Sequence, residues 1–174
     1  MKIPFNIIYN EYYKPIYGFI YRLTFSKSDS EDIVQDVFIK LHAEITKGNE
    51  IDNAKAWLYR CSLNIFLNNK KRKKVIHFTD NIHQFEKESS NSLENDILIK
   101  EKKQKITEAL LSLQDHEQAI INLYNDDLSY KQISEIMGIK FSSVGKTLSR
   151  AIEKLSNQIK LISHGEMCKQ RNIV

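Results

Sequence analysis

LSYKQISEIMGIKFSSVGKTLSRAIEKL, the stretch from Leu128 to Leu155, decides how the C-terminal half of this chain folds. Its apolar residues recur at helical spacing on both sides of a single glycine, which predicts two short helices joined by a tight turn. Ser129 has the side chain of a helix N-cap, and Gly138 supplies the left-handed conformation that favours a helix C-terminus. This arrangement is typical of a helix-turn-helix.

The second helix of the pair is predicted to be capped by Ser142 or Ser143 and to turn one apolar face inward, made of Val144, Leu148, Ala151, Ile152 and Leu155. On or near its other face are six hydroxyl or basic residues: Ser142, Ser143, Lys146, Thr147, Ser149 and Arg150. A helix of this size fits the DNA major groove, where Lys and Arg read guanine edges and Ser or Thr contacts a base or a phosphate. The alternative is the solvated face of an ordinary helical bundle.

Composition favours an all-α chain of two small helical domains. Five Gly and two Pro in 174 residues leave few turn-forming residues for a sheet protein. The net charge of +4 is concentrated, because residues 70–74 are all basic and residues 129–174 also carry a basic excess, with an acidic stretch between them. Two such zones indicate two contacts with a polyanion.

The N-terminal half is predicted to hold three helices. In the first, an aromatic and aliphatic face is assigned to the core: Phe5, Tyr9, Tyr12, Ile16, Phe19 or Ile20, and Leu23. Ser28 and Glu31 have capping-box spacing at the start of the second helix. That helix is expected to bury Val34, Val37, Leu41 and Ile45 and to expose Asp32, Gln35 and Asp36.

A third helix is predicted from Ala54 to Lys74, after a polar loop over residues 46–53. Its inward residues are expected to be Trp57, Leu58, Cys61, Ile65 and Phe66, and its outward ones Lys55, Arg60, Asn64, Asn68 and Lys71. The basic run at its end either follows a phosphate backbone or only complements the helix dipole.

Residues 75–97 lose helical periodicity and gain Ser, Asn and acidic side chains, which predicts a flexible acidic linker. The chain is therefore divided into a first domain over 1–74, the linker, a second domain over 98–160 and a tail over 161–174. In the second domain, Ile106, Leu110 and Leu113 precede a helix that starts at Asp115 and turns four residues inward: Ala119, Ile120, Leu123 and Tyr124.

No set of side chains predicts catalysis or a cofactor. Asp32 and Asp36 lie four apart on one helix, but no His or third carboxylate has matching spacing. His164 and Cys168 are two potential ligands and do not complete a metal site. Two cysteines give no disulfide framework, and neither a signal peptide nor a membrane-spanning run is found, so a cytoplasmic protein that is not an enzyme is expected.

Both halves together resemble an extracytoplasmic-function sigma factor of the sigma-70 family, from about Phe5 to Leu155. SDSEDIVQDVFIKLH is similar to the family's acidic stretch ending in D-x-x-Q-x-x-F, here Asp32, Gln35 and Phe38. AKAWLYRCSLNIFLNNKKRKK is similar to its next helix, with Trp57 and Asn64 in place. ALLSLQDHEQAIINLYNDDLSYKQISEIMGI is close to the family's region 4.

The resemblance implies a bacterial transcription initiation factor that binds core RNA polymerase, through the β′ clamp helices and the β flap, and promoter DNA. It implies polymerase docking by Asp32, Gln35, Asp36 and Phe38. It implies minus-ten recognition and melting, with candidate contacts Asn53, Lys55, Asn64, Asn68, Lys71 and Arg72, and minus-thirty-five recognition by residues 142–150. An anti-sigma factor is a further expected partner, and no small-molecule substrate is expected. The alternative function is a helix-turn-helix repressor or activator that acts without polymerase core binding.

Overall fold

The structure, a computed structural model, describes residues 4–76 and 104–171, and the side chains of residues 4–72 and 104–163. Within these ranges all regular elements are helices, which confirms the predicted all-α class. In chain order they are α1 (Phe5–Thr24), α2 (Lys27–Thr46), α3 (Ala54–Ile76), a helical segment over residues 104–111, α5 (Asp115–Asn125), α6 (Tyr130–Met137) and α7 (Phe141–Arg171).

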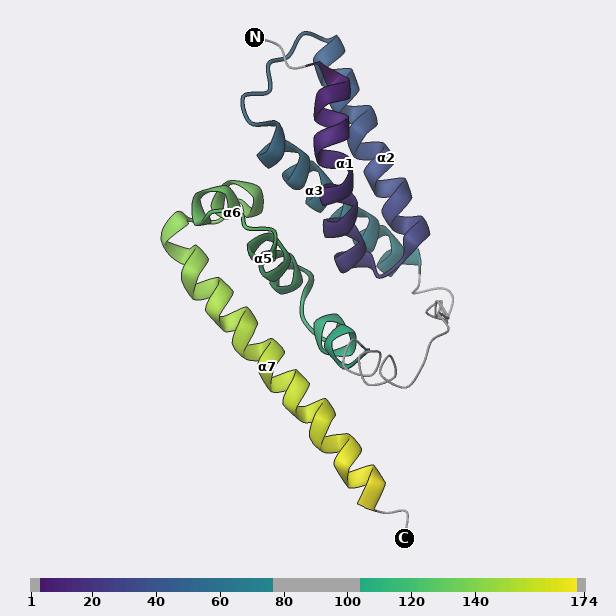
Figure 1. The fold of residues 1–174 in the computed structure, drawn as a ribbon, viewed down its shortest axis with the longest axis vertical. Coiled ribbons are helices and arrows are strands. Elements are labelled where there is room, and N and C mark those ends of the chain that lie inside the picture. The colour runs from purple at the N-terminus through teal and green to yellow at the C-terminus, as the bar shows by residue number, and fades with distance from the viewer. Residues whose placement is uncertain (1–3, 77–103, 172–174) are drawn as a thin grey trace.

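The first three helices form a bundle in which α1 and α2 run side by side and α3 crosses them (Figure 1). The predicted apolar faces of α1 and α2 are largely confirmed by six fully buried residues: Ile16, Phe19, Leu23, Val34, Val37 and Leu41. Tyr9 was wrongly assigned to the core. Its side chain is 38% exposed, and its ring lies at the surface against Phe38 of α2.

The start of α2 differs from the prediction, because Ser26 caps the helix in place of Ser28. The Ser26 hydroxyl accepts a hydrogen bond of 3.2 Å from the Asp29 amide. The corner before it is fixed by the buried Ser30, whose hydroxyl lies 2.5 Å from the Ser26 carbonyl oxygen and 2.8 Å from the Thr24 hydroxyl. This buried corner favours the earlier cap over the equally spaced Ser28 and Glu31.

The inward side of α3 was only partly predicted. Leu58, Ile65 and Phe66 are buried as expected, whereas Trp57 and Cys61 are only half-buried. Buried residues that the prediction missed are Ala56, Tyr59, Ser62 and Leu63. The difference arises because α3 packs against α1 and α2 on one side and against α6 on the other, so its buried surface is wider than one stripe.

The predicted caps of α6 are confirmed. The Ser129 hydroxyl accepts from the Gln132 amide, and Gly138 ends the helix in the left-handed region with φ of 65°. The second helix of the pair starts at Phe141, so Ser142 and Ser143 lie in its first turn and do not cap it. It then continues without a break past residue 160 to Arg171. Three residues assigned inward are exposed: Ile106, Tyr124 and Ile152.

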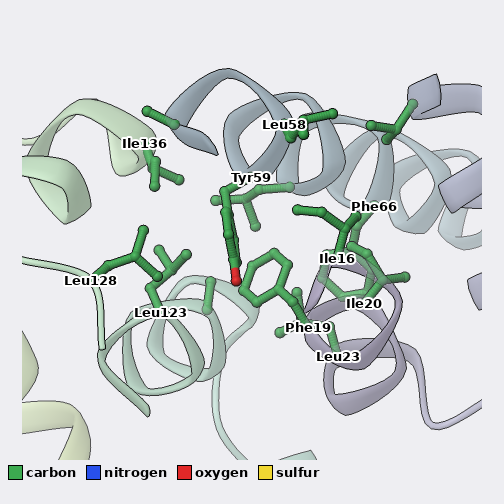
Figure 2. Packing of buried hydrophobic residues seen from close by; sticks show 14 of the residues in the cluster. Ile16, Phe19, Ile20, Leu23, Leu58, Tyr59, Phe66, Leu123, Leu128 and Ile136 are labelled. Atoms are coloured by element: carbon green, nitrogen blue, oxygen red, sulfur yellow. The ribbon is translucent and has the colours of Figure 1, made fainter. Parts of the chain in front are cut away.

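The N-terminal and C-terminal helices pack directly on each other. α1 lies against α5, and α3 lies against α6 (Figure 1). One continuous core joins the two halves, and Figure 2 shows the Tyr59 ring between Phe19 on one side and Leu123 and Leu128 on the other. The predicted linker overlaps α3 at residues 75–76, and its remainder, 77–97, lies outside the described residues.

Candidate functional site

An open groove of about 610 Å³ runs between α1 and α2. Both helices contribute to it, with four aromatic rings, three aliphatic or imidazole side chains and two polar ones: Phe5, Tyr9, Tyr13, Phe38, Val34, Ile39, His42, Glu31 and Gln35. Of these nine residues, Gln35 and Phe38 were predicted from the sequence as docking residues, and the other seven were missed. The signal for the α1 residues was the aromatic repeat at every fourth position, from which Phe5 and Tyr9 were interpreted as core.

The floor of this groove is an aromatic cluster around Phe38. This side chain is only 4% exposed. Its ring centroid lies 4.8 Å from that of Tyr9, 6.1 Å from that of Tyr13 and 6.4 Å from that of Phe5. Phe38 therefore shapes the groove from below, whereas Ile39 next to it is 58% exposed and presents an apolar side chain at the surface.

Two polar residues of α2, Glu31 and Gln35, line the groove. Asp32, Gln35 and Asp36 are exposed, as the sequence predicted, but of these three only Gln35 lines the groove. An apolar floor with an acidic and amide rim matches an amphipathic helix that carries apolar residues on one stripe and basic residues beside it.

A second candidate surface is the outer face of α3. Five exposed polar residues recur there at steps that place them on one side of the helix: Arg60, Asn64, Asn68, Lys71 and Arg72. Asn53 is exposed, but its Oδ1 accepts a 3.0 Å hydrogen bond from the Ala56 amide and so caps the helix. Lys55 is half-buried. The face can contact a phosphate backbone through its cations and bases through its amides.

The basic residues at the end of α3 differ in their contacts: Lys70 packs within the protein, and Lys71 and Arg72 face solvent. Lys70 lies 5.2 Å from the centre of the Phe66 ring and forms an ion pair with Asp115 of α5. Lys71 and Arg72 are exposed to solvent. Within the described part of this run, two of the three cations thus remain available to an outside polyanion.

The third candidate surface is the beginning of α7. Ser142, Lys146, Ser149 and Arg150 are exposed there. Ser143 and Thr147 are half-buried, and the Thr147 hydroxyl donates to the Ser143 carbonyl oxygen at 2.8 Å, so its proton is used within the helix. The exposed face therefore has two cations and two hydroxyls, the chemistry that contacts bases and phosphates in a major groove.

A polar cluster that sequence reasoning did not anticipate joins the two halves. We call it the Asp126 cluster, and its members are Arg22, Tyr59, Asn122 and Asp126. Arg22 donates from Nε to Asn122 Oδ1 at 3.1 Å and forms an ion pair with Asp126, while the Tyr59 hydroxyl donates to Asp126 Oδ2 at 3.1 Å.

Burial sets the protonation behaviour of this cluster. It raises the pKa of the Asp126 carboxyl, and the neighbouring Arg22 guanidinium and Tyr59 hydroxyl offset only part of that effect. Burial, with the nearby Asp126 charge, also raises the pKa of Tyr59 far above its usual range, so the phenol keeps its proton and remains a donor.

Among the side chains that the structure describes, no group of three or more His, Cys, Asp or Glu residues gathers closely enough to hold a metal ion. His164 and Cys168 lie outside the described side chains. None of the described helices is both long and apolar enough to cross a membrane.

Comparison with known proteins matches both halves to one family. Residues 8–75 match the model for sigma-70 region 2, and residues 103–155 match that for sigma-70 region 4. The chain is 28% identical to RNA polymerase sigma factor YlaC of Bacillus subtilis over 155 residues, which is 83% of this chain and 85% of the relative. It is 26% identical to the extracytoplasmic-function sigma factor SigW of the same organism over 166 residues, 90% of this chain and 89% of that one.

A solved structure has the same fold. It is the sigma factor RpoE in complex with the anti-sigma factor NepR from Bartonella quintana, with a TM-score of 0.70 and 23% identity. The likeness covers 90% of this chain and 96% of that one, so both helical halves are included.

Proposed function

This chain belongs to the sigma-70 family as an extracytoplasmic-function RNA polymerase sigma factor, and we propose which of its surfaces carry out that function. It is a bacterial transcription initiation factor that binds core RNA polymerase and directs it to promoters. The observation that supports this assignment most directly is that region 2 and region 4 occur in one chain, in this order, and together cover more than two thirds of its length.

Core polymerase binds at the groove between α1 and α2. The β′ clamp helices offer a helical surface, and the groove has the apolar floor and polar rim that an amphipathic helix requires. Gln35 and Ile39 contact the incoming helix directly, Asp32 and Asp36 pair with its basic residues, and Phe38 supports the floor. A β flap contact on region 4 completes the assembly.

Promoter DNA binds at the two other surfaces. Asn64, Asn68, Lys71 and Arg72 on the exposed face of α3 contact the minus-ten element, with Lys55 and Asn53 at the start of that helix nearby. At the start of α7, the four exposed residues Ser142, Lys146, Ser149 and Arg150 read the minus-thirty-five element, and the half-buried Ser143 and Thr147 hold that surface in shape.

The chain lends specificity to the polymerase and makes no covalent bond of its own. An anti-sigma factor is proposed as its inhibitor, since the structural relative RpoE is found in complex with one. The alternative function, a helix-turn-helix repressor or activator that does not bind polymerase, is disfavoured. It explains neither the match to region 2 nor the groove between α1 and α2.

Transcription in vitro tests this function. The purified chain is added to bacterial core polymerase on genomic DNA of its source, and the 5′ ends of the transcripts are mapped. We expect starts at a restricted promoter set that are absent with core alone. Core that gives the same transcripts with and without the chain contradicts the assignment.

A pair of matched variants tests the groove. Ile39→Glu places a charge among the aromatic lining, whereas Ile7→Glu makes the same change on an equally exposed α1 residue that does not line the groove. We expect Ile39→Glu to weaken core binding at least tenfold, since burying an unpaired carboxylate is costly, and Ile7→Glu to leave it unchanged. Equal affinities for both variants would place the polymerase elsewhere.

A further inference from the structure

We propose that Phe141 is a specificity-determining residue of region 4, and that its ring contacts the C5-methyl group of a thymine in the minus-thirty-five element. The inference rests on the proposed function and deepens it, since it adds an apolar reader to the start of α7. The residues already proposed to read the element there are hydroxyls and cations: Ser142, Lys146, Ser149 and Arg150.

Phe141 is the most exposed aromatic residue among the side chains that the structure describes, at 62%. A single exposed apolar residue is common on protein surfaces and by itself indicates no function. Its place is what distinguishes Phe141. It is the first residue of α7 and directly precedes Ser142, and in helix-turn-helix proteins the beginning of the second helix is the part that reaches the base edges.

The side of α7 that carries Phe141 leaves room for a base pair. Gly145 and Ser149 follow Phe141 at four-residue steps, so the three residues share one side of the helix. Gly145 has no side chain and Ser149 has a short one. Neither of the next two residues on this side therefore projects as far as the Phe141 ring, and DNA can approach that ring closely.

Two exposed tyrosines extend the apolar surface beside Gly145. A Cβ built at Gly145 would lie 3.5 Å from the Tyr130 ring, and the ring centroid of Tyr130 lies 6.4 Å from that of Tyr124. These rings come from α6 and from the end of α5, where α6 meets the start of α7 (Figure 1). Phe141 thus belongs to an apolar patch that borders the side chains proposed to contact DNA.

Exposed lysines border this patch on both helices. Lys131 is next to Tyr130 in α6, Lys140 directly precedes Phe141, and Lys146 directly follows Gly145. DNA supplies phosphates that pair with such cations and bases that meet an apolar ring between them. An apolar protein surface would offer these ammonium groups no partner. The charge around Phe141 therefore favours DNA as the molecule that covers its ring.

Thymine is the base whose edge suits a phenyl ring. In the major groove its C5-methyl group is the apolar feature that an unmodified base pair presents, and the remaining base edges present hydrogen-bond donors and acceptors. Burying one methyl group is worth about fourfold in affinity. Phe141 and Lys146 are separated by about 7.5 Å along α7, so the thymine lies about two base pairs from the base that Lys146 contacts.

Deoxyuridine substitution tests the contact, because it removes the methyl group and leaves the base pair intact. The full chain with core polymerase is titrated with promoter duplexes in which each thymine of the minus-thirty-five element is replaced singly. At one thymine we expect the natural chain to bind about fourfold more weakly after replacement. Phe141→Ala should bind the thymine duplex at least about fourfold more weakly than the natural chain and should not distinguish thymine from deoxyuridine there.

Ile152→Ala is the matched control, since it truncates another exposed apolar residue of α7, about three turns further along the helix. It should keep the preference for thymine. If Phe141→Ala loses helix by circular dichroism, Phe141→Gln replaces it, with the same criterion.

Four results overturn the proposal: equal affinity for the thymine and deoxyuridine duplexes at every position, a preference that Phe141→Ala keeps, a preference that Ile152→Ala also loses, or an element without an A·T pair. A holoenzyme that binds no promoter refutes the proposed function as well. A holoenzyme that binds promoters with no preference for the methyl group refutes only the role of Phe141.

Discussion

The Tyr59 hydroxyl donates a hydrogen bond of 3.1 Å to Asp126, a residue 67 positions further along the chain. The Tyr59 ring is packed in the core and its polar end reaches the only carboxylate in the Asp126 cluster. A single side chain thus contributes both to the hydrophobic boundary between regions 2 and 4 and to the polar contact across it.

Tyr59→Phe separates these two contributions, because the ring remains and the hydroxyl is lost. We expect the free energy of unfolding to fall by about 0.5–1.5 kcal/mol, the usual net value of one hydrogen bond. Urea unfolding followed by circular dichroism measures it. Tyr124→Phe, which removes a hydroxyl from a half-exposed ring, is the control and should be neutral. An equally neutral Tyr59→Phe would mean that the bond adds nothing to stability.

Local chemistry explains why much of region 4 could be predicted from the sequence. Ser129 and Gly138 act on backbone groups within four residues of themselves, so the caps of α6 follow from residue type and spacing alone. The same holds for the exposed face of α2, where Asp32, Gln35 and Asp36 lie opposite a regular apolar stripe.

The Asp126 cluster could not be predicted in this way. Its contacts join residues more than 60 positions apart, and nothing in the spacing of Arg22, Tyr59 or Asp126 marks them as partners. Tyr59 also falls outside the single stripe expected for α3, since that helix is buried on two sides. The α1 side of the groove was missed for a related reason: aromatic residues at helical spacing fit a core and an exposed groove equally well.

Gly145 near the start of α7, the helix proposed to read the minus-thirty-five element, is a position where a substitution should stabilise the protein. A Cβ built there would lie 3.5 Å from the Tyr130 ring, an ordinary van der Waals contact. We expect Gly145→Ala to raise the free energy of unfolding by about 0.5–1 kcal/mol, because alanine favours the helix. Gly138→Ala is the counterpart with opposite sign, since Gly138 has φ of 65° and alanine there is strained. Urea unfolding of both variants checks the pair, and a destabilising Gly145→Ala would mean that Tyr130 cannot accommodate the methyl group.

Glu117 should make the stability of region 4 dependent on pH. Burial by itself raises the pKa of its carboxyl, but hydrogen bonds from Lys154 and from the Gln114 amide outweigh burial, and the pKa lies below its usual value of 4.5. A carboxyl whose pKa is lowered on folding stabilises the protein above its unfolded pKa, and that contribution is lost as the pH falls through the folded value.

We therefore expect Glu117→Gln to cost about 1 kcal/mol at pH 7, a modest value because Lys154 is 56% exposed and solvent screens the pair. The difference from the natural chain should shrink below about pH 4. Thermal unfolding at pH 7 and below pH 4 measures it, and the exposed Glu153→Gln serves as control. A cost that is the same at both pH values would show that the charge of Glu117 is irrelevant.

At the start of α7, Gly145 has no side chain with which to contact DNA. Two exposed cations on that part of the helix, Lys146 and Arg150, are available for the contact. Lys146 is nearer the start of α7, the end that usually enters the major groove, and Arg150 lies about 6 Å further along. We expect Lys146 to contact a base edge and Arg150 to hold a phosphate. Lys146→Ala should then cost about 1–3 kcal/mol at one base pair of the minus-thirty-five element and relax the preference there. Arg150→Ala should weaken binding almost equally on all sequences and lower the salt slope by about one.

Transcription from a library of minus-thirty-five variants, with each alanine variant at two salt concentrations, separates these roles. Ser149→Ala, between the two cations and also exposed, shows how much a neutral truncation on the same face changes the profile. The assignment is reversed if Arg150→Ala loses activity at one base pair only while Lys146→Ala loses it uniformly. It is also wrong for both residues if neither profile differs from that of the natural chain, because an exposed cation in contact with DNA contributes either to sequence preference or to salt dependence.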